Sequence, residues 1–364
     1  MTSYERATRV ERFETVIVGA GQSGLAAGYH LARHDADFEI LGDEKRVGDN
    51  WRNRWDALRL FTPARYSGLP GMPFPAMPSQ LPDKDEVADY LERYANRFDL
   101  PVRLDTRVTS LTWDDGRFAL RTDSSASLIE AENVVVATGP FHRPLIPAVS
   151  ARMSPRIHQL HSTAYRNPFE LPEGSVLVVG AGNSGAQIAL ELAQSRKVWL
   201  AGRNTGHLPR RVLGRDLFDW LWPVMKRATT ETRLGRRMRA SARSGGDALI
   251  GIPERQLRES GVTRVGRLDD ERNGAPVCGG VALDPRVIVW CTGFSPDYSW
   301  IDMPLFGGDG LPRHDRGVVA EAPGLYFLGL RFQYRLNSSL IGGVGEDAAF
   351  IADQVARRCA LVAA

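Results

Sequence analysis

The residues of this sequence best suited to chemistry are two sets of glycines spaced to approach a phosphate. They lie in GAGQSG, starting at Gly19, and GAGNSG, starting at Gly180. Each copy reads G-x-G-x-x-G, follows an apolar run typical of a buried strand, and precedes an alanine-rich stretch that predicts a helix. In such a unit the first glycine permits a tight turn, the second lets backbone approach a diphosphate, and the third lets helix and strand pack closely. The residues expected to bind cofactor are Gly19, Gly21, Gln22, Ser23 and Gly24 in the first copy, and Gly180, Gly182, Asn183, Ser184 and Gly185 in the second.

The residues about 20 positions later predict that the two turns bind different nucleotides. The first unit presents Asp43 and Glu44, and a carboxylate there can accept hydrogen bonds from an adenosine ribose; Asp43 is favoured as the ligand. The second unit has Arg203 with no acid beside it, and a guanidinium suits the 2′-phosphate of NADPH. Since NADPH donates hydride, the other nucleotide is most simply FAD.

Each of these features also has a purely structural interpretation. A glycine turn can serve packing alone, one of the two acids can be a solvated turn residue, and Arg203 can be a surface arginine. The duplication and the strand-turn-helix context favour nucleotide binding.

The elements that position these turns predict an α/β fold with an insertion. The strand-turn-helix pattern of the N-terminal part restarts near Ser175, and RVIVWCTGF later repeats the Thr-Gly ending of NVVVATGP. We expect two Rossmann-like dinucleotide-binding domains of the three-layer ββα type, with the NADPH domain inserted in the FAD domain. The expected FAD domain is 10–145 plus 285–364, and the expected NADPH domain is 146–284, including an arginine-rich segment at 203–250.

Composition argues against several other classes of protein. The 364 residues carry a net charge of only +3, so neither a nucleic acid nor a membrane surface is expected as a partner. The three cysteines form no C-x-x-C, and the sparse, odd count fits the cytoplasm. No signal peptide or spanning segment is apparent. His158 and His161 have no further ligands nearby, so no metal site is expected and a linker role is favoured for His161.

Further motifs in the sequence resemble those of the class B flavin monooxygenases, which include flavin-containing monooxygenases and YUCCA-type enzymes. They are VGDNWRNRWDALRLFTP, ATG at 137–139, CTGF at 291–294, GLYFLGL and GVGEDAAFIA, and the resemblance spans about 14–357. It implies that Trp51 packs beside the flavin and that backbone near Val108 meets the adenine. It also implies that Thr138-Gly139 and Thr292-Gly293 are the two crossings between domains.

The sequence departs from the family pattern at two places. HSTAYRNP supplies only half of the identifying motif, with Pro155 and Ile157 replacing its Phe and Gly. The loop after Trp51 lacks an asparagine that many members carry, which leaves Thr62 as the candidate catalytic donor.

The resemblance implies an NADPH-dependent FAD monooxygenase that transfers one oxygen atom of O2 to a small molecule through a flavin C4a-hydroperoxide. A flavin reductase or oxidase that releases H2O2, and a non-catalytic redox sensor, stay open as alternatives. The substrate is not readable, although the loops near 60–80 and 207–250 are expected to line its site. The oligomeric state is open between monomer and homodimer.

Overall fold

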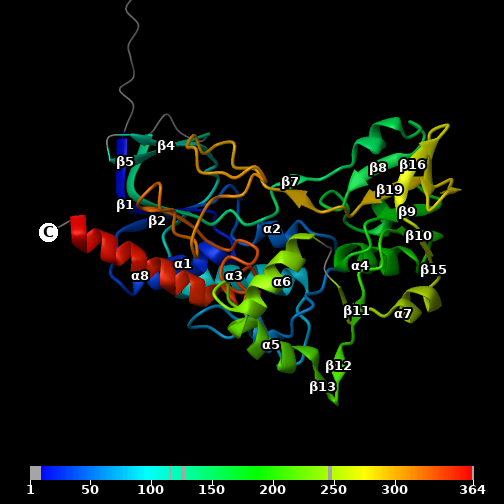
Figure 1. Ribbon diagram of the computed structural model, residues 1–364, viewed down its shortest axis with the longest axis horizontal. Helices are drawn as coiled ribbons and strands as arrows, with labels where there is room; N and C mark the ends of the chain where they lie inside the picture. Colours follow the sequence, from blue (N-terminus) through cyan, green and yellow to red (C-terminus); the bar gives the residue numbers. More distant parts are fainter. Residues whose placement is uncertain (1–9, 115, 124–127, 245–247, 363–364) are drawn as a thin grey trace, which may run out of the picture.

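The computed structural model describes residues 10–114, 116–123, 128–244 and 248–362. It has two lobes, each built on its own sheet (Figure 1). The lobes have the same order of elements, in which a buried parallel strand leads through a glycine turn into a helix. The expected α/β architecture with two Rossmann-like sheets is confirmed.

The first lobe contains a seven-stranded sheet in the order β3-β2-β1-β6-β5-β4, with β21 also paired to β6. Helices α1, α3 and α8 cover one face. Side chains of β4 and β5, which continue the same sheet, pack with the segment 298–330 against the other face, which gives three layers. The bounds are β1 Val10–Val18, α1 Gln22–Ala32, β2 Phe38–Leu41, α2 Asp49–Arg52, α3 Lys84–Arg97, β3 Val102–Arg103, β4 Val108–Asp114, β5 Arg117–Thr122, β6 Leu128–Val136, β21 Leu325–Phe327 and α8 Val344–Val362.

Helix α3 begins as its sequence predicts. Asp83 accepts hydrogen bonds from the backbone N–H groups of Asp85 and Glu86, and the Glu86 side chain accepts one from the Asp83 N–H. This capping box satisfies donors that a helix end otherwise leaves unpaired.

The second lobe contains a five-stranded parallel sheet in the order β15-β10-β9-β19-β8. Its α4 and α7 pack on one face, and the small antiparallel sheet β16-β17-β18 packs on the other. The bounds are β8 His158–His161, β9 Val176–Val179, α4 Asn183–Leu192, β10 Val198–Ala201, α7 Glu254–Glu259, β15 Val262–Val265, β16 Leu268–Arg272, β17 Ala275–Cys278, β18 Val281–Ala282 and β19 Val287–Trp290.

One expected boundary between the domains needs correction. A boundary at 285 assigns β19 to the first domain, but β19 lies between β9 and β8 in the second sheet. The four consecutive buried residues of β19 are typical of a strand covered on both faces. Because both sheets contain such strands, the sequence alone does not indicate to which sheet β19 belongs.

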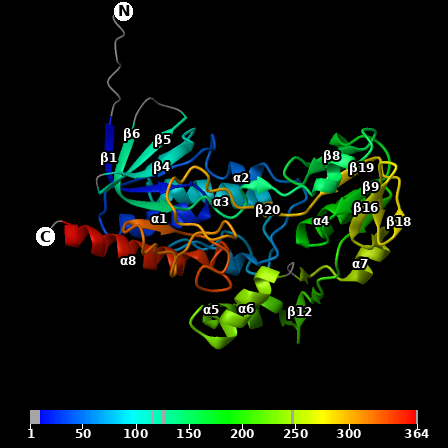
Figure 2. The ribbon, with the colours of Figure 1, turned by 45° about the horizontal axis from the view of Figure 1, so that its top comes forward.

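The arginine-rich segment also lies elsewhere than expected. It forms β11 His207–Leu208, β12 Arg211–Val212, β13 Arg215–Asp216, α5 Leu217–Arg227, α6 Arg233–Ser244 and β14 Leu249–Ile250. Its helices extend away from the second sheet and lie beside the first lobe (Figure 2). Two ion pairs, Arg65–Asp219 at 2.6 Å and Lys226–Glu346 at 2.9 Å, join α5 to that lobe.

Two short strands connect the lobes. β7 Arg143–Pro144 leaves the first lobe and β20 Phe294–Ser295 returns to it, and the two pair antiparallel (Figures 1 and 2). The crossings therefore run side by side.

Candidate functional site

The first glycine of each turn has a backbone conformation that favours glycine. Gly19 has φ +113° and Gly180 has φ +110°, which side chains rarely tolerate. A Cβ on Gly24 would lie 1.9 Å from the Gly19 oxygen, and one on Gly185 would lie 1.8 Å from the Gly180 oxygen. The third glycine of each copy is therefore required for close packing of helix against strand, as its position predicts.

The second glycine of each turn lies beside open space. Gly21 has φ −79° and Gly182 has φ −81°, so neither backbone needs glycine. A Cβ on Gly21 would have only Asn50 within 4 Å, and one on Gly182 would have nothing. Both turns open onto the N-terminus of a helix, where free N–H groups suit a diphosphate. The residues present thus fit two dinucleotides.

Each turn also contacts the crossing that leaves its own lobe. A Cβ on Gly19 would lie 2.6 Å from the Ala137 oxygen, and one on Gly180 would lie 2.2 Å from the Cys291 oxygen. Thr138-Gly139 and Thr292-Gly293 follow these two residues directly. The structure therefore brings both predicted crossings next to the predicted nucleotide turns.

Hydrogen bonds from two neutral histidines hold the crossings. His142 Nδ1 accepts from the Asp297 N–H at 2.8 Å, so its Nε2 donates to the Thr138 hydroxyl at 3.1 Å. His161 Nδ1 accepts from the Thr163 N–H, and its Nε2 donates to the Gly293 oxygen at 3.1 Å. Burial lowers the pKa of both histidines, which keeps them in these neutral forms.

The hydroxyl of Thr292 donates to the Leu145 oxygen and so links the two crossings to each other. These contacts support the predicted linker role of His161.

The side chains of Gln22 and Asn183 are used within the protein. Gln22 Nε2 donates to the Ser339 oxygen at 3.1 Å. Asn183 donates to the Ala248 oxygen and accepts from the Ile250 N–H at 2.9 Å. Their backbone N–H groups, together with those of Ser23 and Ser184, are the part left for a phosphate.

The two acids beside the first turn, of which the sequence favours Asp43 as the ribose ligand, differ in their surroundings. Asp43 is exposed and forms an ion pair with Arg107 at 3.0 Å. Glu44 is half-buried, and its Oε1 is buried without a hydrogen-bond partner. Burial, and then the charge of Asp43, raise the pKa of Glu44 to about 7. An orphaned carboxylate of this kind fits a donor that arrives with the cofactor.

Gly42 and Gly202, which directly follow the second strand of each unit, pack against the two glycine turns. A Cβ on Gly42 would lie 2.9 Å from the Ala20 side chain, and one on Gly202 would lie 2.8 Å from the Ala181 nitrogen. The carboxyl carbon of Glu44 lies 3.5 Å from the position that a Cβ on Gly42 would occupy. Glu44 thus folds back over its strand end toward the first turn.

Arg203 follows Gly202 directly and is exposed, so it can reach a phosphate. A second arginine that the sequence does not single out, Arg264 on β15, lies beside it. Arg264 Nη2 is 3.4 Å from the Gly202 oxygen, and its buried Nη1 has no partner. Burial lowers the pKa of Arg264, and the charge of Glu254 offsets this shift only in part.

Trp51 and Val108 both belong to the first lobe. Half-buried Trp51 packs against the cores of both lobes. Val108 is buried at the start of β4 and follows Arg107, the partner of Asp43. Both positions are compatible with their expected contacts to flavin and adenine.

Arg54 is a further residue that the sequence reasoning misses. Its guanidinium lies 5.7 Å from the Phe141 ring and 5.8 Å from the Phe294 ring, between the crossings. Its Nε donates to the Asn50 oxygen, and no carboxylate in the described residues forms an ion pair with it. Burial, and then Arg166, lower the pKa of Arg54. Phe141 and Phe294 are far from Arg54 in the sequence, so local spacing gives no sign of this contact.

Thr62 does not present a free donor. It is buried, and its hydroxyl lies 3.1 Å from that of Ser67. Ser67 donates its own proton to the Pro63 oxygen at 3.0 Å, so the Thr62 proton goes to Ser67.

Other chemistries find no support in the part of the chain that the structure describes. The three cysteines are unpaired, and burial raises the pKa of Cys278 to about 11 and those of Cys291 and Cys359 to about 12. Such thiols are poor nucleophiles at neutral pH. No group of three metal-ligating side chains occurs among the described residues, and none of their helices is long and apolar enough to cross a membrane.

Known proteins share this arrangement. Residues 16–241 match the model of the pyridine nucleotide-disulphide oxidoreductase family. An uncharacterized oxidoreductase CzcO-like from Geobacillus kaustophilus is 41% identical over 94% of this chain and 98% of its own length. The flavin-containing monooxygenase from Stenotrophomonas maltophilia superposes with a TM-score of 0.73 at 26% identity, covering 96% of this chain and 99% of that one. The probable indole-3-pyruvate monooxygenase YUCCA9 of Arabidopsis thaliana is 34% identical over 58% of this chain, which spans about half (52%) of that protein.

The chain belongs to the class B flavin monooxygenase family. FAD and NADPH are the cofactors of this family, and the chain is an oxidoreductase of that type. The flavin monooxygenase fold thus accounts for why one chain has two glycine turns.

Proposed function

We propose that this flavin monooxygenase reduces FAD at the first turn with NADPH bound at the second, and then transfers one atom of O2 to a small molecule. The observation that carries the proposal is that one chain has two glycine turns with differently charged residues beside them. Glu44, whose buried Oε1 lacks a partner, belongs to one turn, and exposed Arg203 belongs to the other. Both turns contact the crossings that join the lobes. FAD bound in the lobe that contains β1 would supply the oxygen chemistry.

The residues of the chain bind and orient the two cofactors. The glycine turns hold the diphosphates, Glu44 accepts from the flavin-nucleotide ribose, and Arg203 with Arg264 recognises the 2′-phosphate. Trp51 excludes water between the lobes, while His142 and His161 fix the crossings.

One observation favours a second candidate, a flavin oxidase that releases H2O2. The Thr62 proton is used by Ser67, so the loop after Trp51 supplies no hydroxyl donor to protect an oxygenated flavin. Disulfide reduction is not supported, because the described cysteines are free and unpaired.

Stopped-flow mixing of the NADPH-reduced protein with O2 tests the proposal. A monooxygenase gives a delay before oxidised flavin reappears, and substrate shortens that delay. Immediate reoxidation with one H2O2 per NADPH, unchanged by any tested amine or thioether, would establish the oxidase instead.

A further inference from the structure

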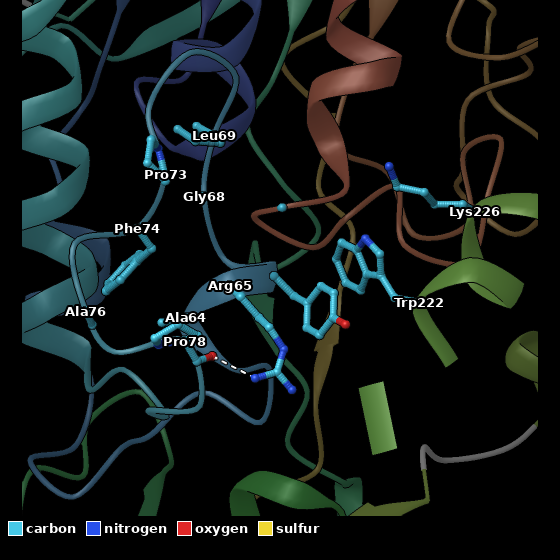
Figure 3. Close-up of a pocket in the computed structure, with 12 residues that line it drawn as sticks. Ala64, Arg65, Gly68, Leu69, Pro73, Phe74, Ala76, Pro78, Trp222 and Lys226 are labelled. Atoms are coloured by element: carbon cyan, nitrogen blue, oxygen red, sulfur yellow. Dashed lines mark hydrogen bonds between the residues drawn. The ribbon is translucent and has the colours of Figure 1, made fainter. Parts of the chain in front are cut away.

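The two loops expected to line a substrate site meet around one cavity. It has a volume of about 560 Å³, within the range typical of small-molecule sites. One wall comes from the loop 64–78 of the first lobe, and the other comes from α5 of the arginine-rich segment (Figure 3).

The cavity wall is aromatic where the two segments meet. The Tyr66 and Trp222 rings stack at 4.9 Å with an angle of 30° between them. Phe74 lines the opposite side, and both Phe74 and Trp222 are buried in the protein (Figure 3). Flat, apolar walls of this kind favour a planar apolar ligand.

The first-lobe wall is preformed. Tyr90 accepts a hydrogen bond from the Leu69 N–H and donates one to the Met72 oxygen, both at 2.6 Å. Tyr94 donates to the Pro70 oxygen at 2.7 Å. These bonds fix the loop against α3, so a ligand does not have to order it.

The charged side chains that line the cavity each have an ion-pair partner. Arg65 pairs with Asp219 at 2.6 Å, and Asp219 also accepts from the Tyr66 hydroxyl at 2.7 Å. Lys226 pairs with Glu346 at 2.9 Å, and Glu346 also pairs with Arg335. A charged ligand would have to break one of these pairs or enter without a counter-ion, and both cost free energy.

The cavity is next to the expected flavin site. Gly342, which lines it, lies in the same loop as Ser339, the acceptor for Gln22 in the first glycine turn. The N-terminus of α8 follows two residues later, at Val344.

We propose that this cavity binds the substrate and that the substrate is an uncharged planar aromatic compound, selected by Tyr66, Phe74 and Trp222. The substrate assignment rests on the proposed monooxygenase function, whereas the binding site does not. For an aromatic thioether, one atom of O2 forms the sulfoxide and the other leaves as water. NADPH and one proton supply the two electrons and the hydrogen that complete the balance.

Calorimetric titration of the flavin-loaded protein tests the site without turnover. The probes are methyl phenyl sulfide, 4-(methylthio)benzoate and 4-(methylthio)benzylamine, which share a ring and thioether but differ in charge. We expect the neutral sulfide to bind at least about tenfold more tightly than either ion, because burying a charge without a partner is costly. Equal or tighter binding of an ion would overturn the selection of neutral ligands.

Matched variants locate the site. Trp222→Ala removes a wall, and Ala76→Trp fills the cavity without deleting a buried ring; we expect each to abolish sulfide binding. Trp220→Ala is the control, because Trp220 lies on the same helix but is 45% exposed and does not line the cavity. Unchanged binding in both cavity variants would refute the site. Tight binding without sulfoxide formation would instead refute the monooxygenase function and leave the site standing.

Discussion

The two glycine turns have nearly the same backbone but very different surroundings. Gly19 and Gly180 differ by 3° in φ (113° against 110°). In both turns, a Cβ on the third glycine would lie less than 2 Å from the carbonyl oxygen of the first. Beyond the turns, the first lobe has a half-buried acid with one buried oxygen that lacks a partner, while the second lobe has two arginines. The shared geometry serves a diphosphate common to both nucleotides, and the differences select which nucleotide binds.

The largest expected effect comes from the second glycine of each turn. Gly21→Ala and Gly182→Ala should fold normally, because neither position has strained φ or a close contact. The added methyl group occupies space that a diphosphate needs, so we expect at least about a tenfold loss of affinity, or 1.4 kcal/mol. Gly21→Ala should lose FAD and Gly182→Ala should lose NADP⁺, as measured by flavin content and calorimetry.

Unchanged binding in both variants would mean that the glycines serve packing alone. Thermal unfolding of each flavin-free protein is the control for the fold.

The next effect separates NADPH from NADH. Arg203→Ala should raise the KM for NADPH by about tenfold or more, the size expected for one lost charge-assisted hydrogen bond, and leave that for NADH unchanged. Steady-state kinetics with each nucleotide measures the change in the two KM values. An equal change for both would place Arg203 outside the 2′-phosphate site.

A smaller effect distinguishes Glu44 from Asp43. Without flavin, ionising Glu44 costs stability as the pH rises from 4.5 through about 7, because the folded pKa is raised. Ribose hydroxyls favour the ionised form, so FAD affinity should fall as the pH drops below about 7, by less than about tenfold in all.

Glu44→Gln should remove this pH dependence. Asp43→Asn should keep it but shift it to lower pH, because the Asp43 charge contributes to the raised pKa of Glu44. FAD titrations of the flavin-free protein across pH 5–8 measure both. A profile that Asp43→Asn flattens and Glu44→Gln does not would restore Asp43 as the ligand.

The smallest effect is expected at Thr62. Its proton is held by Ser67, so Thr62→Ala should change the yield of H2O2 per NADPH by less than about twofold. A peroxide assay compares the variant with wild type. A severalfold rise would show that Thr62 turns toward the flavin when the enzyme is loaded.

Features that depend on local sequence could be predicted, and features that depend on distant segments could not. The glycine roles and the α3 capping box follow from spacing within a few residues. The choice of Glu44 over Asp43 depends on Arg107, which comes from the approach to β4.

The same limit applies to two features that the sequence does not indicate. The packing of α5 on the first lobe depends on Arg65 and Glu346, which are far from α5 in the sequence. The uncompensated guanidinium of Arg54 is recognisable only once Phe141 and Phe294 lie beside it.

Anaerobic reduction of the flavin tests the central claim most directly. Wild-type protein and Gly182→Ala, both loaded with FAD, are mixed with NADPH while the flavin absorbance near 450 nm is followed. We predict rapid bleaching of the wild type, and bleaching of the variant only at NADPH concentrations at least about tenfold higher. Equal bleaching at every concentration would show that NADPH does not use the second turn, and would contradict the account.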